Sequence, residues 1–186
     1  MKVRVIESVF VVLCAIAAFG QRSGDDAGIL YGTDYSFAVT APHGWVLDDK
    51  SGKSQGVCAV LYETGKSWQK ADTVMYVNTA SKTIEGQKTL EELMAYDAAE
   101  FKKRAPALSV TPAPDIKTKQ GRAVVRRFEG DEYGNYEAVA YFDEKLTIVM
   151  FVLTARTKKD FDAAYPAFEK LVGSYYFLTS NVTIGK

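Results

Sequence analysis

The feature that most constrains the fold is an almost unbroken apolar run in the second half of the chain, Leu146-Thr-Ile-Val-Met-Phe-Val-Leu153. A strand with one face in water alternates apolar and polar residues, whereas this run is apolar at nearly every position. Such a strand needs cover on both faces, which places it inside a sheet. The connection from the preceding apolar segment is only Asp143–Lys145, too short for a crossover helix. The sequence therefore predicts an antiparallel sheet with 146–153 as a central strand.

Two segments with helical periodicity can cover the two faces of this strand. They span 89–104 and 160–175, and each begins with a capping-box pattern, at Thr89 and at Thr157. Pro166 is expected to kink or divide the second helix. The apolar stripes are Leu90, Leu93, Met94, Ala98 and Phe101 in the first segment and Phe161, Ala164, Tyr165, Phe168, Leu171, Val172 and Tyr175 in the second. The predicted fold class is α+β, an antiparallel β-sheet sandwiched between helices in α/β/α layers.

The remaining strands are shorter, and proline marks one of them as an edge. Leu108–Ile116 contains Pro112 and Pro114, which cannot donate backbone hydrogen bonds to a neighbouring strand, so this segment is predicted to lie at an edge or to be irregular. Further strands are predicted over 35–40, 57–62, 73–78, 122–128 and 136–142.

The first 20 residues are typical of a secretory signal peptide. Lys2 and Arg4 precede an apolar stretch of 11 residues, Val9–Phe19, and Ala18-Phe-Gly20 matches a small-x-small cleavage pattern. This stretch is too short to cross a bilayer as a helix, which favours cleavage over the alternative of a retained anchor. We expect an exported protein, periplasmic or extracellular. Its expected parts are a signal peptide at 1–20, a flexible leader at 21–33, a single α+β domain at 34–180 and a C-terminal tail at 181–186.

Charge and cysteine content narrow the classes of function. The chain has 23 basic and 23 acidic residues and a net charge of zero, so no global field attracts nucleic acid. The mature chain has no apolar run long enough for a transmembrane segment. Cys58 is the only cysteine after cleavage, which excludes an intramolecular disulfide. Because Cys58 lies in an apolar run, we interpret it as a small buried hydrophobic residue rather than a reactive thiol.

The sequence contains no motif for catalysis, cofactor binding or metal binding. Gly65-Lys66-Ser67 follows a predicted strand, but Val60 stands where a phosphate-binding loop requires glycine. His43, the only histidine, lies in a turn without a neighbouring nucleophile motif. A group of acidic residues flanks two successive predicted strands and could share a divalent cation if its turns lay at the same end of the sheet. Because the turns at the two ends of a strand point opposite ways, we favour solvated turns for these residues: Glu129, Asp131, Glu132, Glu137, Asp143 and Glu144. We assign no catalytic, cofactor-binding or metal-ligating residue.

Aromatic residues in predicted loops are the candidates for partner contact. Trp68, Tyr133 and Tyr136 fall in or beside such loops, and Asn135 lies in the same turn as Tyr133. Exposed aromatic side chains are enriched where proteins contact one another. The alternative is that these rings close the ends of the core.

Two local motifs and the order of elements resemble the PsbP-like domain family. Tyr35-Ser-Phe-Ala-Val-Thr-Ala-Pro-His-Gly-Trp45 resembles the family's aromatic-x-F-x-V … P-x-G-W opening, and Phe161–Phe177 resembles its last helix with an aromatic end. The resemblance covers most of the mature chain. It implies an antiparallel sheet between helices and kinship with exported bacterial relatives of the photosystem II extrinsic subunit. Members include photosystem subunits, assembly factors and a Ran-binding import factor, and most of them bind proteins. Some bind metal ions, but no matching ligand motif occurs here.

These observations favour a binding role over an enzymatic one. The first hypothesis is a non-enzymatic exported domain that binds another protein or helps to assemble a membrane-bound complex of the cell envelope. The alternative is a small-ligand-binding protein or a hydrolase that uses acidic and tyrosine side chains in a pocket between sheet and helix. A deep pocket with converging carboxylates would favour the alternative. A flat surface rimmed by aromatic residues would favour protein binding.

Overall fold

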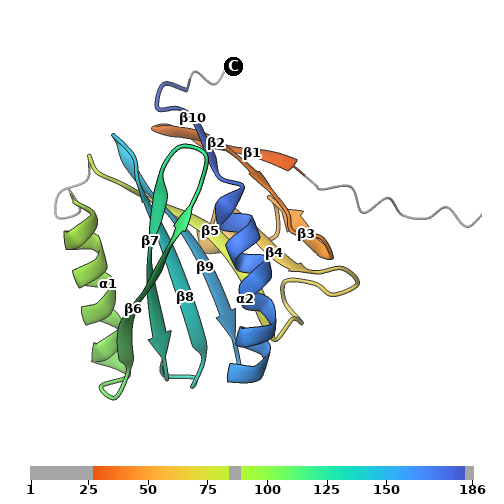
Figure 1. Cartoon of the computed structure of the whole chain (residues 1–186), viewed down its shortest axis with the longest axis vertical. Coiled ribbons are helices and arrows are strands. Elements are labelled where there is room, and N and C mark those ends of the chain that lie inside the picture. The colour runs from red at the N-terminus through yellow and green to blue at the C-terminus, as the bar shows by residue number, and fades with distance from the viewer. Residues whose placement is uncertain (1–26, 84–88, 183–186) are drawn as a thin grey trace, which may run out of the picture.

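A computed structural model describes residues 27–83 and 89–182, which form two antiparallel sheets and two α-helices (Figure 1). The larger sheet has seven strands in the order β3-β4-β5-β9-β8-β7-β6, and the smaller has three in the order β1-β2-β10. The elements are β1 (Ala27–Gly32), β2 (Tyr35–Thr40), β3 (Trp45–Asp48), the 3-10 turn η1 (Lys53–Gln55), β4 (Ala59–Glu63), β5 (Thr73–Ser81), α1 (Leu90–Arg104), β6 (Ser109–Lys117), β7 (Arg122–Glu129), β8 (Tyr136–Asp143), β9 (Thr147–Ala155), α2 (Lys158–Gly173) and β10 (Tyr176–Thr179). The predicted α+β class is confirmed.

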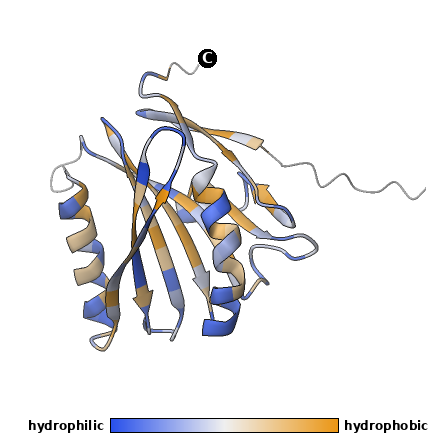
Figure 2. Ribbon diagram, viewed as in Figure 1, coloured by the Kyte–Doolittle hydropathy of each residue, from blue (hydrophilic) through white to orange (hydrophobic). Residues whose placement is uncertain are grey.

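Strand β9 lies in the middle of the large sheet, as the unbroken apolar run predicts. It pairs with β5 along its whole length and with β8 on its other side. Phe151 and Leu153 point into a core that α2 covers, whereas Ile148 and Val152 point into a second core that α1 covers. Figure 2 shows apolar residues along the strands between the two helices. Both faces of the large sheet are therefore buried at its centre, which confirms the layered arrangement.

Helix α2 covers the first of these cores. The Thr157 hydroxyl accepts a hydrogen bond from the backbone N–H of Asp160 at 3.1 Å and so caps the helix N-terminus. The helix runs without interruption through Pro166, so this residue does not divide it. Phe168 and Leu171, in the turns that follow the proline, are fully buried. Their packing offsets the backbone hydrogen bond that the proline cannot make.

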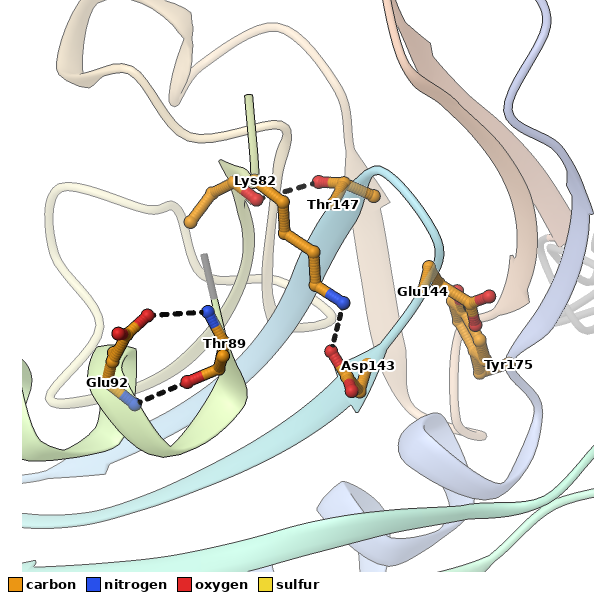
Figure 3. Close-up of polar contacts among 8 residues, drawn as sticks. Lys82, Thr89, Glu92, Asp143, Glu144, Thr147 and Tyr175 are labelled. Atoms are coloured by element: carbon orange, nitrogen blue, oxygen red, sulfur yellow. Dashed lines mark hydrogen bonds and ion pairs between the residues drawn. The ribbon is translucent and has the colours of Figure 1, made fainter. Parts of the chain in front are cut away.

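Helix α1 covers the second core, and its predicted capping box is present (Figure 3). The Thr89 hydroxyl accepts from the Glu92 N–H at 3.1 Å, and the Glu92 carboxylate accepts from the Thr89 N–H at 2.9 Å. Leu90 and Leu93 are the buried residues of this helix. The helix therefore has a well-defined start but buries a narrower stripe than α2, which has five buried residues.

Strand β1 corrects the expectation of a flexible leader over residues 21–33. Ala27–Gly32 pairs with β2 in antiparallel register along its full length, and Leu30 is buried in the α2-side core. The segment is short and flanked by glycine, so it has too few residues to show a strand period. Its conformation depends on pairing with β2 and on burial of Leu30. Residues 1–26, which include the predicted signal peptide, lie outside the described residues.

Strand β10 occupies the other edge of β2 and follows α2 directly. The Ser174 hydroxyl, between α2 and β10, accepts a hydrogen bond from the Thr40 N–H at 2.9 Å and fastens the end of the helix to β2. The first and last described strands therefore meet in one small sheet. Figure 1 shows this sheet at the upper end of the molecule, above α2.

Strand β6 forms the outer edge of the large sheet, as its prolines predict. Its register with β7 shifts between Ala113 and Ile116, beside Pro114.

No helix within residues 27–83 and 89–182 has the length and apolar character needed to span a membrane.

Candidate protein-contact surface

The outer face of the small sheet carries most of the large apolar side chains that remain in water. Across residues 27–83 and 89–182, six such side chains are exposed, and four of them belong to this sheet. They are Ile29 and Tyr31 on β1, 61% and 60% exposed, and Tyr176 and Leu178 on β10, 44% and 45% exposed. An apolar cluster on one face of a protein marks a site of interaction more often than scattered exposed residues do.

Strand register explains why these side chains gather. Ala38 on the middle strand β2 pairs with Ile29 on one side and with Tyr176 on the other. Because side chains alternate across a strand, the neighbouring residues Leu30 and Phe37 point inward to the core. The small side chain of Ala38 thus lies between two large ones, and the row forms a continuous apolar surface.

A groove runs along the edge of β1 that does not pair with β2. Its largest cavity has a volume of about 390 Å³ and is lined by residues 29–31 of β1. The opposite wall consists of residues 56–58 and of Asn78 and Thr79 on β5. Two further cavities of about 330 Å³ each continue it, one beside Ala27–Leu30 and one beside the β1–β2 turn. The groove therefore follows the whole of β1.

A tyrosine and a cysteine form the inner wall of the groove. The Tyr35 hydroxyl lies 3.1 Å from the Cys58 sulfur, and the Thr79 hydroxyl lies 3.8 Å from the same sulfur. Burial, with a further contribution from the hydrogen bond to Cys58, raises the pKa of Tyr35 to about 12. Cys58 packs partly against the core, as the apolar run predicts, but it is half-buried and lines the groove.

The far end of the groove is held in place by contacts around the β8–β9 turn (Figure 3). Thr147, which lines the cavity beside the β1–β2 turn, donates a hydrogen bond from its hydroxyl to the Ala80 carbonyl at 3.0 Å. Lys82 forms an ion pair with Asp143 across the same end of the sheet. The ends of β5, β8 and β9 are thereby fixed relative to one another.

The residues predicted to contact a partner lie elsewhere and are not all together. Tyr133 is 80% exposed in the β7–β8 turn, and Asn135 in the same turn donates two hydrogen bonds to Asp131, at 2.8 and 3.0 Å. Tyr136 is half-buried against the α2-side core. Trp68 packs edge-on against Tyr76, which belongs to the α1 side of the sheet. The structure thus groups Tyr133 with Asn135 and separates Trp68 from Tyr136.

Sequence reasoning missed the outer face of the small sheet. Its residues lie at opposite ends of the domain, in β1 and β10, and only β2 brings them together. A local signal was present in β1, where Ile29, Leu30 and Tyr31 are good strand formers between Gly28 and Gly32. The exposure of Ile29 and Tyr31 could not be read from that segment.

The acidic residues interpreted as solvated turns include one that is buried. Glu137 lies within β8 rather than in a turn, is 7% exposed, and has no hydrogen-bond partner for its Oε2 atom. Burial raises its pKa to about 7. Its side chain points to the α1 side, because the preceding Tyr136 and following Ala138 pack on the α2 side. The interpretation of Glu137 as a solvated turn residue is therefore wrong.

A second carboxyl group, that of Asp97 on α1, faces the same side of the sheet. The Tyr141 hydroxyl donates a hydrogen bond to the Asp97 carboxylate at 3.2 Å. Burial raises the pKa of Asp97, and it also raises the pKa of Tyr76, which in addition feels the charges of Glu137 and Asp97. Acidic and tyrosine side chains therefore do meet between the sheet and a helix. Within residues 27–83 and 89–182, no three His, Cys, Asp or Glu side chains are grouped so that they could hold a metal ion.

The sequence matches no protein-family model and no curated protein. The structure, however, is similar to solved structures. The solution structure of cyanobacterial PsbP from Synechocystis sp. PCC 6803 matches 88% of this chain and 99% of its own, with a TM-score of 0.52 and 16% identity. A mutant of the protein Mog1 matches 86% of this chain and 97% of its own, with a TM-score of 0.51 and 10% identity. The Ran-binding protein Mog1p of Saccharomyces cerevisiae matches 83% and 95%, with a TM-score of 0.49 and 10% identity. At these identities the likeness to cyanobacterial PsbP and to the Mog1 mutant establishes the fold alone, and the chain has a PsbP-like α+β fold.

Proposed function

We propose that this protein is a non-enzymatic, exported member of the PsbP-like family that binds another protein or helps to assemble a complex of the cell envelope. The observation that carries the proposal is the outer face of the small sheet. Four of the six exposed large apolar side chains among residues 27–83 and 89–182 lie there. Ile29 and Tyr31 are 61% and 60% exposed, so burial does not explain why they are apolar, whereas a protein contact would.

Sequence features support the location. The basic start and the 11-residue apolar run before Gly20 have the form of a signal peptide, so the proposed compartment is periplasmic or extracellular. The net charge of zero favours an apolar and hydrogen-bonded contact over an electrostatic one. The likeness of fold to cyanobacterial PsbP agrees with the family resemblance of the sequence.

The test is affinity capture of the full chain from its native cell envelope, with and without the apolar face. The parent should recover a defined partner, and the double variant Ile29→Ser/Tyr31→Ser should lose it. Tyr96→Ser is the matched control, because Tyr96 is also exposed, at 51%, but lies on α1. Equal recovery by the parent and the double variant, or no partner above background, would overturn the proposal.

The turn with Tyr133 and Asn135 is proposed as a second contact, and Trp68 and Tyr136, which lie on opposite sides of the large sheet, remain separate proposed contact residues. Tyr133 is the most exposed of the large apolar side chains in the described residues, at 80%, and Asp131 holds its loop in a fixed shape. Tyr133→Ser in the same capture experiment should reduce partner recovery less than the double variant. If Tyr133→Ser alone abolishes recovery, the turn rather than the small sheet is the main contact.

A second candidate function rests on Glu137. A buried carboxyl group with an unpartnered Oε2 atom, beside tyrosines between sheet and α1, is the arrangement expected for a small-ligand-binding protein or a hydrolase. Under this alternative, a small-molecule library should contain compounds that raise the melting temperature of the parent but not of Glu137→Gln. If every stabilising compound acts equally on both proteins, Glu137 has no ligand-binding role.

A further inference from the structure

Strand β1 has an edge with backbone groups available for pairing. It stands at the end of the small sheet, with β2 on one side, and no other strand of the described part of the chain pairs with it. In an antiparallel pair, the backbone N–H and C=O groups of alternate residues point away from the partner. An open edge of this kind pairs readily with another extended chain.

The groove lies beside this edge rather than over a face of the sheet. Its largest cavity is lined by Ile29, Leu30 and Tyr31, which are consecutive residues. Successive side chains of a strand point to opposite faces, so a cavity that touches all three must reach the backbone edge between them. The neighbouring cavity repeats the pattern with the consecutive residues Ala27–Leu30.

The opposite wall of the groove is also the edge of a strand, β5. Asn78 and Thr79 are consecutive residues of β5, and both line the cavity. Strand β4 pairs with β5 only as far as Val77, where the Cys58 N–H donates to the Val77 carbonyl at 2.8 Å. Beyond that point, this edge of β5 has no strand partner among the described residues. The groove thus lies between two strand edges.

The length of the groove suits one short strand. β1 has six residues, which span about 20 Å at the usual rise of a strand. The walls formed by residues 49–58 and by β5 enclose the groove on the side away from β1. A second copy of this domain would have to bring a whole sheet into that space, whereas one extended peptide needs only the width between neighbouring strands, about 5 Å.

Resting on the proposed function, we propose that β1 receives an extended segment of the partner protein as an added strand, with apolar side chains at alternate positions of that segment. The inner side of the groove combines apolar side chains, among them Leu30, Leu47 and Val57, with the Tyr35 hydroxyl and the Cys58 thiol. Alternate side chains of the added strand point toward it. The other side chains extend the outer face that carries Ile29 and Tyr31. Asp49 and Lys53 at the rim offset each other's charge, so the segment needs no net charge.

The probe is a phage-displayed library of peptides of roughly ten residues, enough to cover the length of β1. The target is the full chain with Cys14→Ser, so that Cys58 in the groove wall is its only thiol. Selected peptides are resynthesised with N-methyl groups on one or the other set of alternate amides. We expect binders with alternating apolar residues, and N-methylation of one set should weaken binding at least about tenfold while the other set has little effect. Bound peptide should also slow alkylation of Cys58.

Three results would overturn the added strand. They are a library that yields no binder, binders for which the two N-methylated sets behave alike, and binders that leave the alkylation rate of Cys58 unchanged. Dimerisation of the chain that itself protects Cys58 would identify a second copy as the occupant and would also overturn it. If the capture experiment still recovers a partner that depends on Ile29 and Tyr31, the proposed function stands while the added strand fails.

Discussion

The two sheets of this domain differ in how far their apolar side chains are buried. At the centre of the large sheet, β9 buries side chains on both faces, and Phe151 and Ile148 have no exposure. The small sheet buries one face through Leu30 and Phe37 but leaves Ile29 and Tyr31 largely in water on the other. In the first case, burial accounts for the apolar residues, of which only Met150 is half-buried rather than buried. In the second, folding leaves the outer residues unexplained, and this difference directs attention to the small sheet as the contact surface.

If the two sheets differ in this way, substitutions at Phe151 and at Ile29 should differ most in how much they lower the free energy of unfolding. Phe151 lies among aromatic rings of the α2-side core, with centroids 5.7 Å from Phe142 and 5.8 Å from Tyr175. Phe151→Ala should lower the free energy of unfolding by about 3–5 kcal/mol, because it removes a buried ring and leaves a cavity. Urea denaturation measures this. A loss below about 1 kcal/mol would mean that β9 is not the packed centre of the fold.

The α1 side of the large sheet should respond to pH through Glu137. Its pKa is raised by burial from 4.5 to about 7, so the protonated form is favoured in the folded state. The stabilising contribution of Glu137 is therefore fully present below pH 4.5 and is lost as the pH rises through 7, by roughly 3 kcal/mol in total. The nearby charges of Asp131 and Arg104 act in opposite directions on this pKa.

Glu137→Gln isolates this effect. The variant cannot ionise at this position, so its unfolding free energy should fall less than that of the parent between about pH 5 and pH 8. The test compares the parent with the variant, because burial also raises the pKa of Asp97 and Glu144. These two groups make the unfolding free energy decrease with pH in both proteins, so only the difference between the curves reports on Glu137. Parallel curves for parent and variant would show that Glu137 is not buried as described.

A moderate effect is expected at the start of α1. Thr89→Ala removes the hydroxyl that accepts from the Glu92 N–H and should reduce stability by about 1 kcal/mol. Thr89→Ser, which keeps the hydroxyl, is the control and should recover most of the loss. If Thr89→Ala and Thr89→Ser unfold at the same urea concentration, the capping hydrogen bond contributes nothing.

The smallest effect on stability is expected on the outer face of the small sheet. Ile29→Ser should change the free energy of unfolding by less than about 0.5 kcal/mol, because its side chain is mostly in water. Partner recovery should fall strongly in the same variant. A loss of stability comparable to that of Phe151→Ala would show that Ile29 serves the fold, and the contrast between the two sheets would disappear.

Much of the large sheet could be predicted from local sequence because its signals are local. The apolar run of β9, the prolines of β6 and the capping residues of α1 each identify their element without reference to distant residues. The residues of β1 favour a strand locally, but its place in the fold could not be predicted, because that depends on pairing with β2 and on burial of Leu30. Burial of Glu137 was also missed, although the predicted strand 136–142 contains this residue, because the cover over its face of the sheet comes from residues distant in the sequence.

Photocrosslinking in native cells most directly tests the claim that the small sheet is the contact surface. A photoreactive benzoylphenylalanine is placed at Tyr31 on β1, at Tyr133 in the β7–β8 turn and at Tyr96 on α1, all of which are exposed. We expect a discrete adduct with another protein from position 31, a weaker one from position 133 and none from position 96. An adduct from position 96 with none from position 31 would contradict it.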